Sequence, residues 1–230
     1  MYKIILLLDF AEEYSKSLLK GISKYSAENG PWTYCRMPLY YRETIGIKGI
    51  LDWAKDWGAD GIIGQLYNEI DLNLLVDAKI PVVAQDFKER FTEIPNITGA
   101  YHEAGEMGAS YFLKKGFKNF AFYGFNDIVW SRERAEGFEK KINATGYKVN
   151  YFEHRKSRST DLWYYKSNSL SKWLLSLPKP IALMTCDDNQ GLHITEACKQ
   201  NKIRIPEEVS VLGVDNDEML CELSDPPLSS

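Results

Sequence analysis

The sequence predicts an α/β fold with two lobes, each a parallel sheet with flanking helices. Short apolar runs alternate with longer stretches of helical periodicity almost from end to end, which is typical of successive βαβ units. One irregular, Pro-containing segment, residues 86–98, interrupts the alternation and divides it into two series. The 230 residues are 44% hydrophobic and 26% charged, which is enough apolar material to build the cores of two lobes of ordinary size.

Eight runs are short and apolar enough to form the buried strands of parallel sheets. In chain order they are Tyr2–Leu8, Trp32–Met37, Gly61–Ile63, Val82–Ala84, Phe120–Tyr123, Lys148–Phe152, Ile181–Thr185 and Val209–Val214. After the last run the sequence predicts one short turn and no closing helix.

About one helix is expected in each gap between strands. The clearest candidates are Tyr14–Glu28, Glu103–Lys115, Arg132–Ala144, Leu162–Leu177 and Asp188–Gln200. Glycines at 30, 116 and 146 mark helix ends, because glycine adopts the left-handed cap conformation without strain. We place the lobe boundary near Ile97, which gives an N-terminal lobe of residues 1–97, a C-terminal lobe of residues 98–224, and a last segment, 225–230, that starts a further crossing.

Composition argues against several classes of protein. With 28 Lys and Arg against 32 Asp and Glu, the net charge is −4, whereas an unaided nucleic-acid binder needs a cationic face. The opening apolar run Ile4–Leu8 is too short for a signal peptide, so we expect a cytoplasmic protein with no membrane partner. The four cysteines lack CxxC spacing and are interpreted as reduced thiols.

The sequence lacks the common motifs of catalysis and cofactor binding. It has no GxxxxGK[ST], no GxGxxG after the first strand, no GxSxG and no HExxH. We therefore expect neither an enzyme nor a protein with a resident metal or cofactor.

Polar side chains follow most of the predicted strands, at the sheet edge where ligands bind in open α/β folds. These positions are Asp9, Phe10, Gln65, Gln85, Asp86, 124–126, Asp187, Asp188, Asp215 and Asn216. The site candidates taken from them are Asp9, Phe10, Asp86, Asp187, Asp188 and Asp215. Trp130 and Arg134 lie four residues apart at a helix start and so share one face. Carboxylates that accept from adjacent hydroxyls, a guanidinium that donates and an indole that covers C–H groups together suit a neutral, polyhydroxylated ligand.

Each candidate also has a purely structural interpretation. Asp187 or Asp188 fits the N-cap of the helix that follows it. Arg134 fits an ordinary surface position on a helix, and Trp130 fits a core aromatic. What favours a ligand site is convergence, because Trp130, Arg134, Asp187 and Asp215 are all placed at one edge of one predicted sheet.

Five segments, in order, give the second half of the chain a family resemblance. They are TGAYHEAGEMGA at 98–109, LKKGFKNFAFYG at 113–124, RAEGF at 134–138, TCDD at 185–188 and PEEVSVLGVDN at 206–216. Together they resemble the effector-binding core of the lactose-repressor family, and the first half resembles that family's first lobe more loosely. Ala100 departs from the pattern, since the family usually has an Asp there.

The resemblance implies a fold like type 1 periplasmic binding proteins, with two lobes, three crossings, a sugar in the cleft and often a homodimer. It places the family's ligand arginine on Arg134, its polar pair on Asp187 and Asp188, and its last cleft aspartate on Asp215. The sheet begins at Tyr2 with no helix-turn-helix ahead of it. One branch of the family starts this way and carries an arabinose-regulator-type helix-turn-helix at its other end, so a C-terminal DNA-binding region is expected to be missing from this chain.

We therefore expect the sugar-sensing domain of a transcription regulator, with D-xylose as effector. Trp130 would stack on the sugar, Arg134 and the acids would bind its oxygens, and Asp9, Phe10 and Asp86 would complete the cleft. Two alternatives stay open: a solute-binding protein that delivers a sugar to a transporter, which would need an export signal, and a sugar-modifying enzyme that uses the paired acids.

Overall fold

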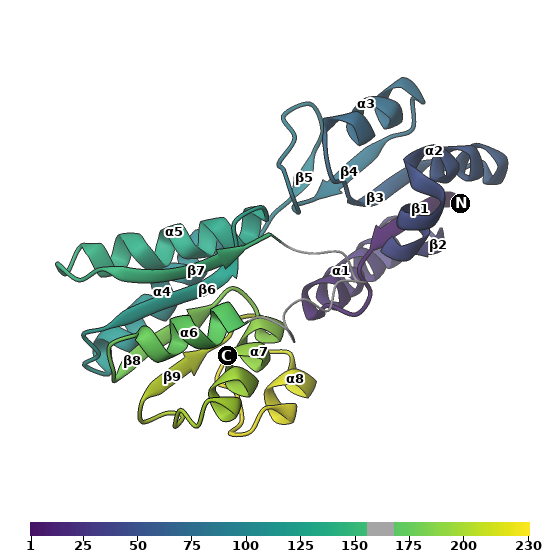
Figure 1. Ribbon diagram of the computed structural model, residues 1–230. Coiled ribbons are helices and arrows are strands. Elements are labelled where there is room, and N and C mark those ends of the chain that lie inside the picture. The colour runs from purple at the N-terminus through teal and green to yellow at the C-terminus, as the bar shows by residue number, and fades with distance from the viewer. Residues whose placement is uncertain (156–167) are drawn as a thin grey trace. The chain divides into compact units, whose positions relative to one another are not determined.

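The computed structural model describes residues 1–155 and 168–230, which form two compact units, residues 1–98 and 99–230. Each unit is a parallel sheet with helices packed on both of its faces (Figure 1). The prediction of an α/β fold with parallel sheets and flanking helices is thereby confirmed.

Unit 1 contains a five-stranded sheet in the order β2-β1-β3-β4-β5. Its elements are β1 (Tyr2–Leu8), α1 (Glu13–Asn29), β2 (Trp32–Pro38), α2 (Leu39–Trp57), β3 (Gly61–Gln65), α3 (Glu69–Asp77), β4 (Val82–Gln85) and β5 (Asn96–Ile97). Successive residues of β1 point to opposite faces. Ile5 and Leu7 join the core under α2 and α3, whereas Ile4, Leu6 and Leu8 join the core under α1.

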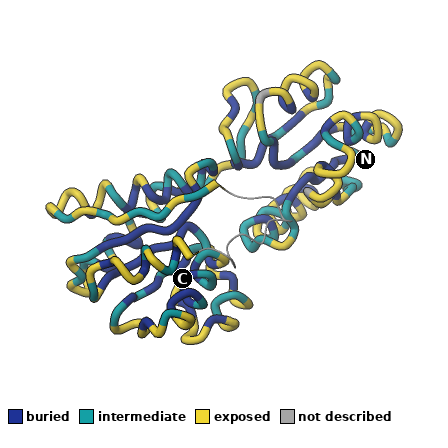
Figure 2. The backbone as a smooth tube through the Cα atoms, in the orientation of Figure 1, coloured by how far each residue is buried: buried dark blue, intermediate teal, exposed yellow. Residues whose placement is uncertain are grey.

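Unit 2 contains a four-stranded sheet in the order β7-β6-β8-β9. Its elements are α4 (Tyr101–Lys114), β6 (Phe120–Phe125), α5 (Val129–Asn143), β7 (Val149–His154), α6 (Asn168–Ser176), β8 (Ile181–Thr185), α7 (Asp188–Gln200), β9 (Val209–Leu212) and α8 (Glu218–Leu223). Helices α4 and α5 cover one face, and α6, α7 and α8 lie on the other (Figure 1). In both units the central strands are the most buried, β1 and β3 in unit 1 and β6 and β8 in unit 2 (Figure 2).

Helices α4 and α5 pack at backbone contact. A Cβ added to Gly105 would overlap the carbonyl oxygen of Arg134, and one added to Gly137 would overlap the carbonyl oxygen of His102. Glycine is therefore required at both positions, since any side chain would push the helices apart. The contact fixes the backbone of α5 at Arg134, one of the residues singled out from the sequence.

Two short elements of the structure were not expected from the sequence. The segment expected to be irregular contains the two-residue strand β5, and helix α8 follows β9 where none was expected. Helix α2 is kinked at Gly46, which has a φ of 65°. The last segment returns to the sheet, because Ser229 bridges to Leu212 and its carbonyl accepts from the Gly213 N–H. Residues 162–167 of the expected helix Leu162–Leu177 lie outside the described residues.

Where the structure describes the chain, no helix has both the length and the apolar character that crossing a bilayer requires.

Candidate functional site at the strand ends of unit 2

Arg134 lies at the centre of a polar cluster beyond the carboxyl ends of β6, β8 and β9. It projects from the second turn of α5 and is only 5% exposed. Its Nη2 donates to Oδ1 of Asp215 at 2.7 Å and its Nη1 donates to Oδ2 at 3.3 Å. The guanidinium and the carboxylate therefore form a bidentate ion pair. Nη1 also donates to the carbonyl oxygen of Cys186. The cluster joins three elements that are far apart in sequence.

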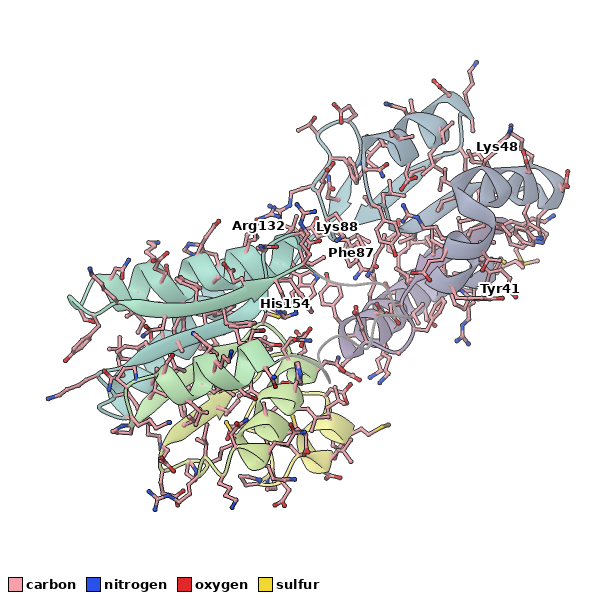
Figure 3. The ribbon with its side chains drawn as sticks, viewed as in Figure 1. Tyr41, Lys48, Phe87, Lys88, Arg132 and His154 are labelled. Atoms are coloured by element: carbon pink, nitrogen blue, oxygen red, sulfur yellow. The ribbon has the colours of Figure 1, made fainter. Side chains whose placement is uncertain are left out.

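Two aromatic rings flank the guanidinium. The Arg134 Cζ lies 5.2 Å from the ring centroid of Trp130 and 5.5 Å from that of Tyr101, both within cation–π distance. Phe125, the last residue of β6, packs edge-on against Trp130 at 6.0 Å and against His154 at 4.9 Å. His154 ends β7 (Figure 3). Arg134 therefore lies within an aromatic wall, and Trp130 stays half-buried at its rim.

The electrostatics of the cluster keep Arg134 charged. Burial by itself lowers the pKa of the guanidinium, but the charge and hydrogen bonds of Asp215, with a further contribution from Asp187, outweigh it and raise the pKa overall. The Nε of Arg134 is buried and has no hydrogen-bond partner in the described part of the chain. A fixed positive charge in an aromatic surround suits a ligand rich in hydroxyl and ring oxygens.

The two neighbouring acids after β8 have different surroundings. Asp187 is the N-cap of α7, where its Oδ1 accepts from the Gln190 N–H at 2.7 Å, and its side chain remains half-buried. Asp188 is 2% exposed and turns into the protein, where its Oδ2 accepts from the Asp217 N–H at 2.7 Å. The structural interpretation of Asp187 as a helix cap is thus correct for one of its oxygens, and Asp188 is held by a different partner.

Three of the sequence-predicted residues lie in unit 1. Asp9 follows β1 and its Oδ1 accepts from the Ala11 N–H at 3.1 Å. Phe10 lies under the guanidinium of Arg36, whose Cζ is 4.7 Å from the ring centroid. Asp86 follows β4 with a fully buried side chain, and its Oδ2 accepts from Nη2 and Nε of Arg90 at 2.6 and 3.1 Å. Phe87 and Lys88 come next in the chain (Figure 3).

Unit 1 also presents acceptor atoms that the sequence-based candidate list omitted. Gln65 and Gln85 are paired residues at the ends of β3 and β4, and both are nearly fully buried. The Oε1 atoms of both side chains, and Oδ1 of Asp86, are buried without a hydrogen-bond partner among the residues described. Because a buried acceptor without a donor is costly, these three oxygens fit a ligand that brings hydroxyl groups.

A family model described as a periplasmic binding protein-like domain matches residues 109–230, more than half of the chain. The chain belongs to this periplasmic binding protein-like family. The resemblance deduced from the five sequence segments is therefore confirmed for the family and for the fold.

Relatives of this periplasmic binding protein-like chain include transcription regulators. The xylose operon regulatory protein of Haemophilus influenzae is 29% identical over 239 aligned residues, which take in all of this chain and 59% of the relative. The chain spans about six tenths of the length of the xylose operon regulatory proteins that it matches.

Solved structures share its fold. A periplasmic binding protein/LacI transcriptional regulator from Alkaliphilus metalliredigens QYMF, complexed with D-xylulofuranose, has a TM-score of 0.76 at 18% identity, over 99% of this chain and 83% of that one. The xylose-binding transcription activator XylR has a TM-score of 0.72 at 22% identity, over 94% of this chain and 55% of that one.

The sequence alone did not identify some of the residues that contact the candidate site residues. Tyr101 lies in the segment 98–109 used for the resemblance, but only its three-dimensional position reveals its contact with Arg134. Arg90 was hidden in the segment expected to be irregular. The strand-end rule did place Gln65 and Gln85 at the sheet edge, but they were not chosen as site candidates. Within residues 1–155 and 168–230, no group of three metal-ligating side chains comes together.

Proposed function

We propose that this chain is the sugar-sensing, effector-binding domain of a transcription regulator, with D-xylose as the effector. The observation that carries the proposal is the cluster in unit 2, in which Arg134 is buried against Asp215 and flanked by Trp130. A guanidinium, a partly exposed carboxylate and an indole supply donors, acceptors and an apolar face to a single pyranose. Similarity over the whole chain to xylose operon regulatory proteins selects a pentose.

Within this proposal each side chain has a distinct task. Trp130 stacks on the C–H face of the sugar, Arg134 donates to ring or hydroxyl oxygens, and Asp187 and Asp215 accept from hydroxyls. Asp215 is suited to this because its side chain is 26% exposed even though it is paired with Arg134. No chemical reaction is assigned to the acids, and the curated relatives are regulators rather than enzymes.

The proposal also assigns ligand contacts to unit 1. Asp9, Phe10 and Asp86 are the residues that the strand-end rule selected there. The unpartnered Oδ1 of Asp86 and the oxygens of Gln65 and Gln85 support this assignment, because all three need donors. Xylose hydroxyls are donors of the right kind.

A regulator is favoured over the transport alternative because the relatives matched over the whole chain are regulators. We propose that the complete protein acts in the cytoplasm as a homodimer, and that DNA is bound by a region outside these 230 residues. Sugar would act by binding one conformation better than another, since equal binding to both would transmit nothing.

Isothermal titration calorimetry tests the proposal with D-xylose, L-arabinose, D-ribose and D-glucose. We expect the tightest binding for D-xylose and a loss of about 10-fold to 100-fold in affinity for Arg134→Ala, the effect of removing a hydrogen bond to a charged group. Arg132→Ala is the matched control, because Arg132 is a half-buried arginine of the same helix that lies two residues earlier and therefore on another side of the helix (Figure 3). Heat from none of the pentoses, or full affinity in Arg134→Ala, would contradict the proposal.

A further inference from the structure

The loop between β9 and α8 has an unusual backbone at Asp215. Asp215 has a φ of 99° and Asn216 a φ of 52°, both on the positive side that residues other than glycine seldom adopt. Such a conformation is unfavourable for these residues and persists only where neighbouring contacts hold it. Asp215 is also the partner of Arg134, so whatever holds this loop also sets the direction of its carboxylate.

Hydrogen bonds hold the loop on each side of Asp215. Ahead of it, the Gly213 N–H donates to the Ser229 carbonyl oxygen at 2.8 Å. After it, the Asn216 N–H donates to Oγ of Ser230 at 2.9 Å, and the Asp217 N–H donates to Oδ2 of Asp188 at 2.7 Å. The hydrogen bond to Asp188 is buried and uses a charged side chain, whereas the one to Ser230 is exposed.

Asp188 is built into the interior for this contact. Its side chain fills the space beside Gly213, where an added Cβ would overlap its Oδ1. Burial raises the pKa of the Asp188 carboxyl, and the hydrogen bond from the Asp217 backbone opposes that rise. The hydrogen bond from Asp217 offsets part of the cost of burying this group. Asp188 therefore has the features of an anchor rather than of a ligand contact.

We propose that Asp188 is a positioning residue for sugar discrimination. By accepting from the Asp217 N–H, it fixes the left-handed turn that directs the Asp215 carboxylate at Arg134 and at one hydroxyl of the sugar. This inference rests on the proposed sugar-binding function for its ligand, but the anchoring of the Arg134–Asp215 pair stands without any ligand.

The first test uses pentoses that differ at one hydroxyl, D-xylose and D-ribose, with the full 230-residue chain. Asp188→Ala should weaken D-xylose binding about 10-fold and bring the two affinities closer together. Asp188→Asn keeps an acceptor oxygen and should preserve most of the discrimination. Asp217→Ala is the control, because it removes the cap of α8 but keeps the N–H that Asp188 accepts. A merely structural role would lower the fraction of active protein and leave the ratio of affinities unchanged, which would overturn the proposal.

A second variant reaches the same contact without removing a polar group. Gly213→Ala would place a methyl group against Oδ1 of Asp188. It should bring the affinities for D-xylose and D-ribose closer together, as Asp188→Ala does. If Asp188→Ala does not fold, this variant and Asp188→Asn decide the question. An unchanged ratio in Gly213→Ala would count against the proposal.

A third test needs no ligand. It measures the coupling energy between Arg134 and Asp215 from the unfolding free energies of Arg134→Ala, Asp215→Ala and the double variant. The cycle is measured in the wild-type chain, in Asp188→Asn and in Gly213→Ala. We expect Gly213→Ala to reduce the coupling several-fold and Asp188→Asn to preserve it. If the wild-type chain binds no pentose, the proposed function fails, yet this coupling still decides whether Asp188 positions Asp215. Equal coupling in all backgrounds would overturn the inference even if xylose binds.

Discussion

The ion pair between Arg134 and Asp215 should contribute measurably to the stability of unit 2. The side chain of Arg134 is 6% exposed and that of Asp215 is 26% exposed, so the pair is neither fully buried nor on the surface. Unit charges about 3 Å apart attract by about 5 kcal/mol at an effective dielectric constant near 20, and desolvation offsets a large part of that. Hydrogen bonds to charged groups retain about 1.5–3 kcal/mol. We therefore expect a coupling energy of about 2 kcal/mol.

A double-mutant cycle measures this coupling. Urea unfolding of the wild-type chain, Arg134→Ala, Asp215→Ala and the double variant is followed by far-ultraviolet circular dichroism and tryptophan fluorescence together, so that the transitions of the two units can be separated. Arg132→Ala combined with Asp215→Ala should show no coupling. A value below about 0.5 kcal/mol, the range of exposed ion pairs, would refute the view of this pair as a semi-buried clamp.

Three further predictions concern packing, pH and a second ion pair. Gly137→Ala should destabilise unit 2 by about 1–3 kcal/mol in thermal unfolding, because its methyl group would overlap the backbone of α4, whereas Gly21→Ala, with open space around it, should stabilise the chain slightly. Burial, assisted by the charge of a neighbouring histidine, lowers the pKa of His154 to about 4. The unfolded chain therefore takes up the proton first, and stability should fall by up to about 1.4 kcal/mol per pH unit from pH 6.5 towards pH 4. Asp71→Ala should destabilise unit 1 by about 3 kcal/mol, because it leaves the buried guanidinium of Arg42 without its carboxylate.

Each of these three predictions has a result that would contradict it. Equal melting temperatures for Gly137→Ala and Gly21→Ala would show that α4 and α5 can separate at no cost. The pH dependence should shrink in His154→Phe, and a variant that keeps the full slope would assign it to other groups. A loss below about 1 kcal/mol for Asp71→Ala would mean that Arg42 finds another partner.

The helices and strands with a clear hydrophobic periodicity were predicted well from the sequence. Strands Tyr2–Leu8 and Ile181–Thr185 and helix Asp188–Gln200 have the predicted bounds, because each is bordered by residues that end its apolar pattern. Strand β5 and helix α8 were missed, since two and six residues are too few to show a period. The kink in α2 is local backbone geometry at a glycine, which composition does not reveal.

The candidate site was predicted only in part, because local spacing places residues on one face but does not specify their distant partners. The i, i+4 spacing of Trp130 and Arg134 predicts a shared helix face, and the strand-end rule predicts polar residues near it. The partners of Arg134, however, lie 52 and 81 residues away, and no local pattern specifies which oxygens it grips. For Asp187 and Asp188 the sequence left the choice between cap and ligand open, and only the fold shows that one caps a helix while the other reaches into the β9–α8 loop.

The glycine contacts between α4 and α5 give unit 2 a mechanical property. Two helices that touch along their backbones have no compressible layer of side chains between them, so they travel as a single piece. Helix α4 begins at Tyr101, three residues after unit 1 ends, and its Gly105 lies against the carbonyl group of Arg134. We therefore expect a displacement of the start of α4 to move the backbone of Arg134 with it.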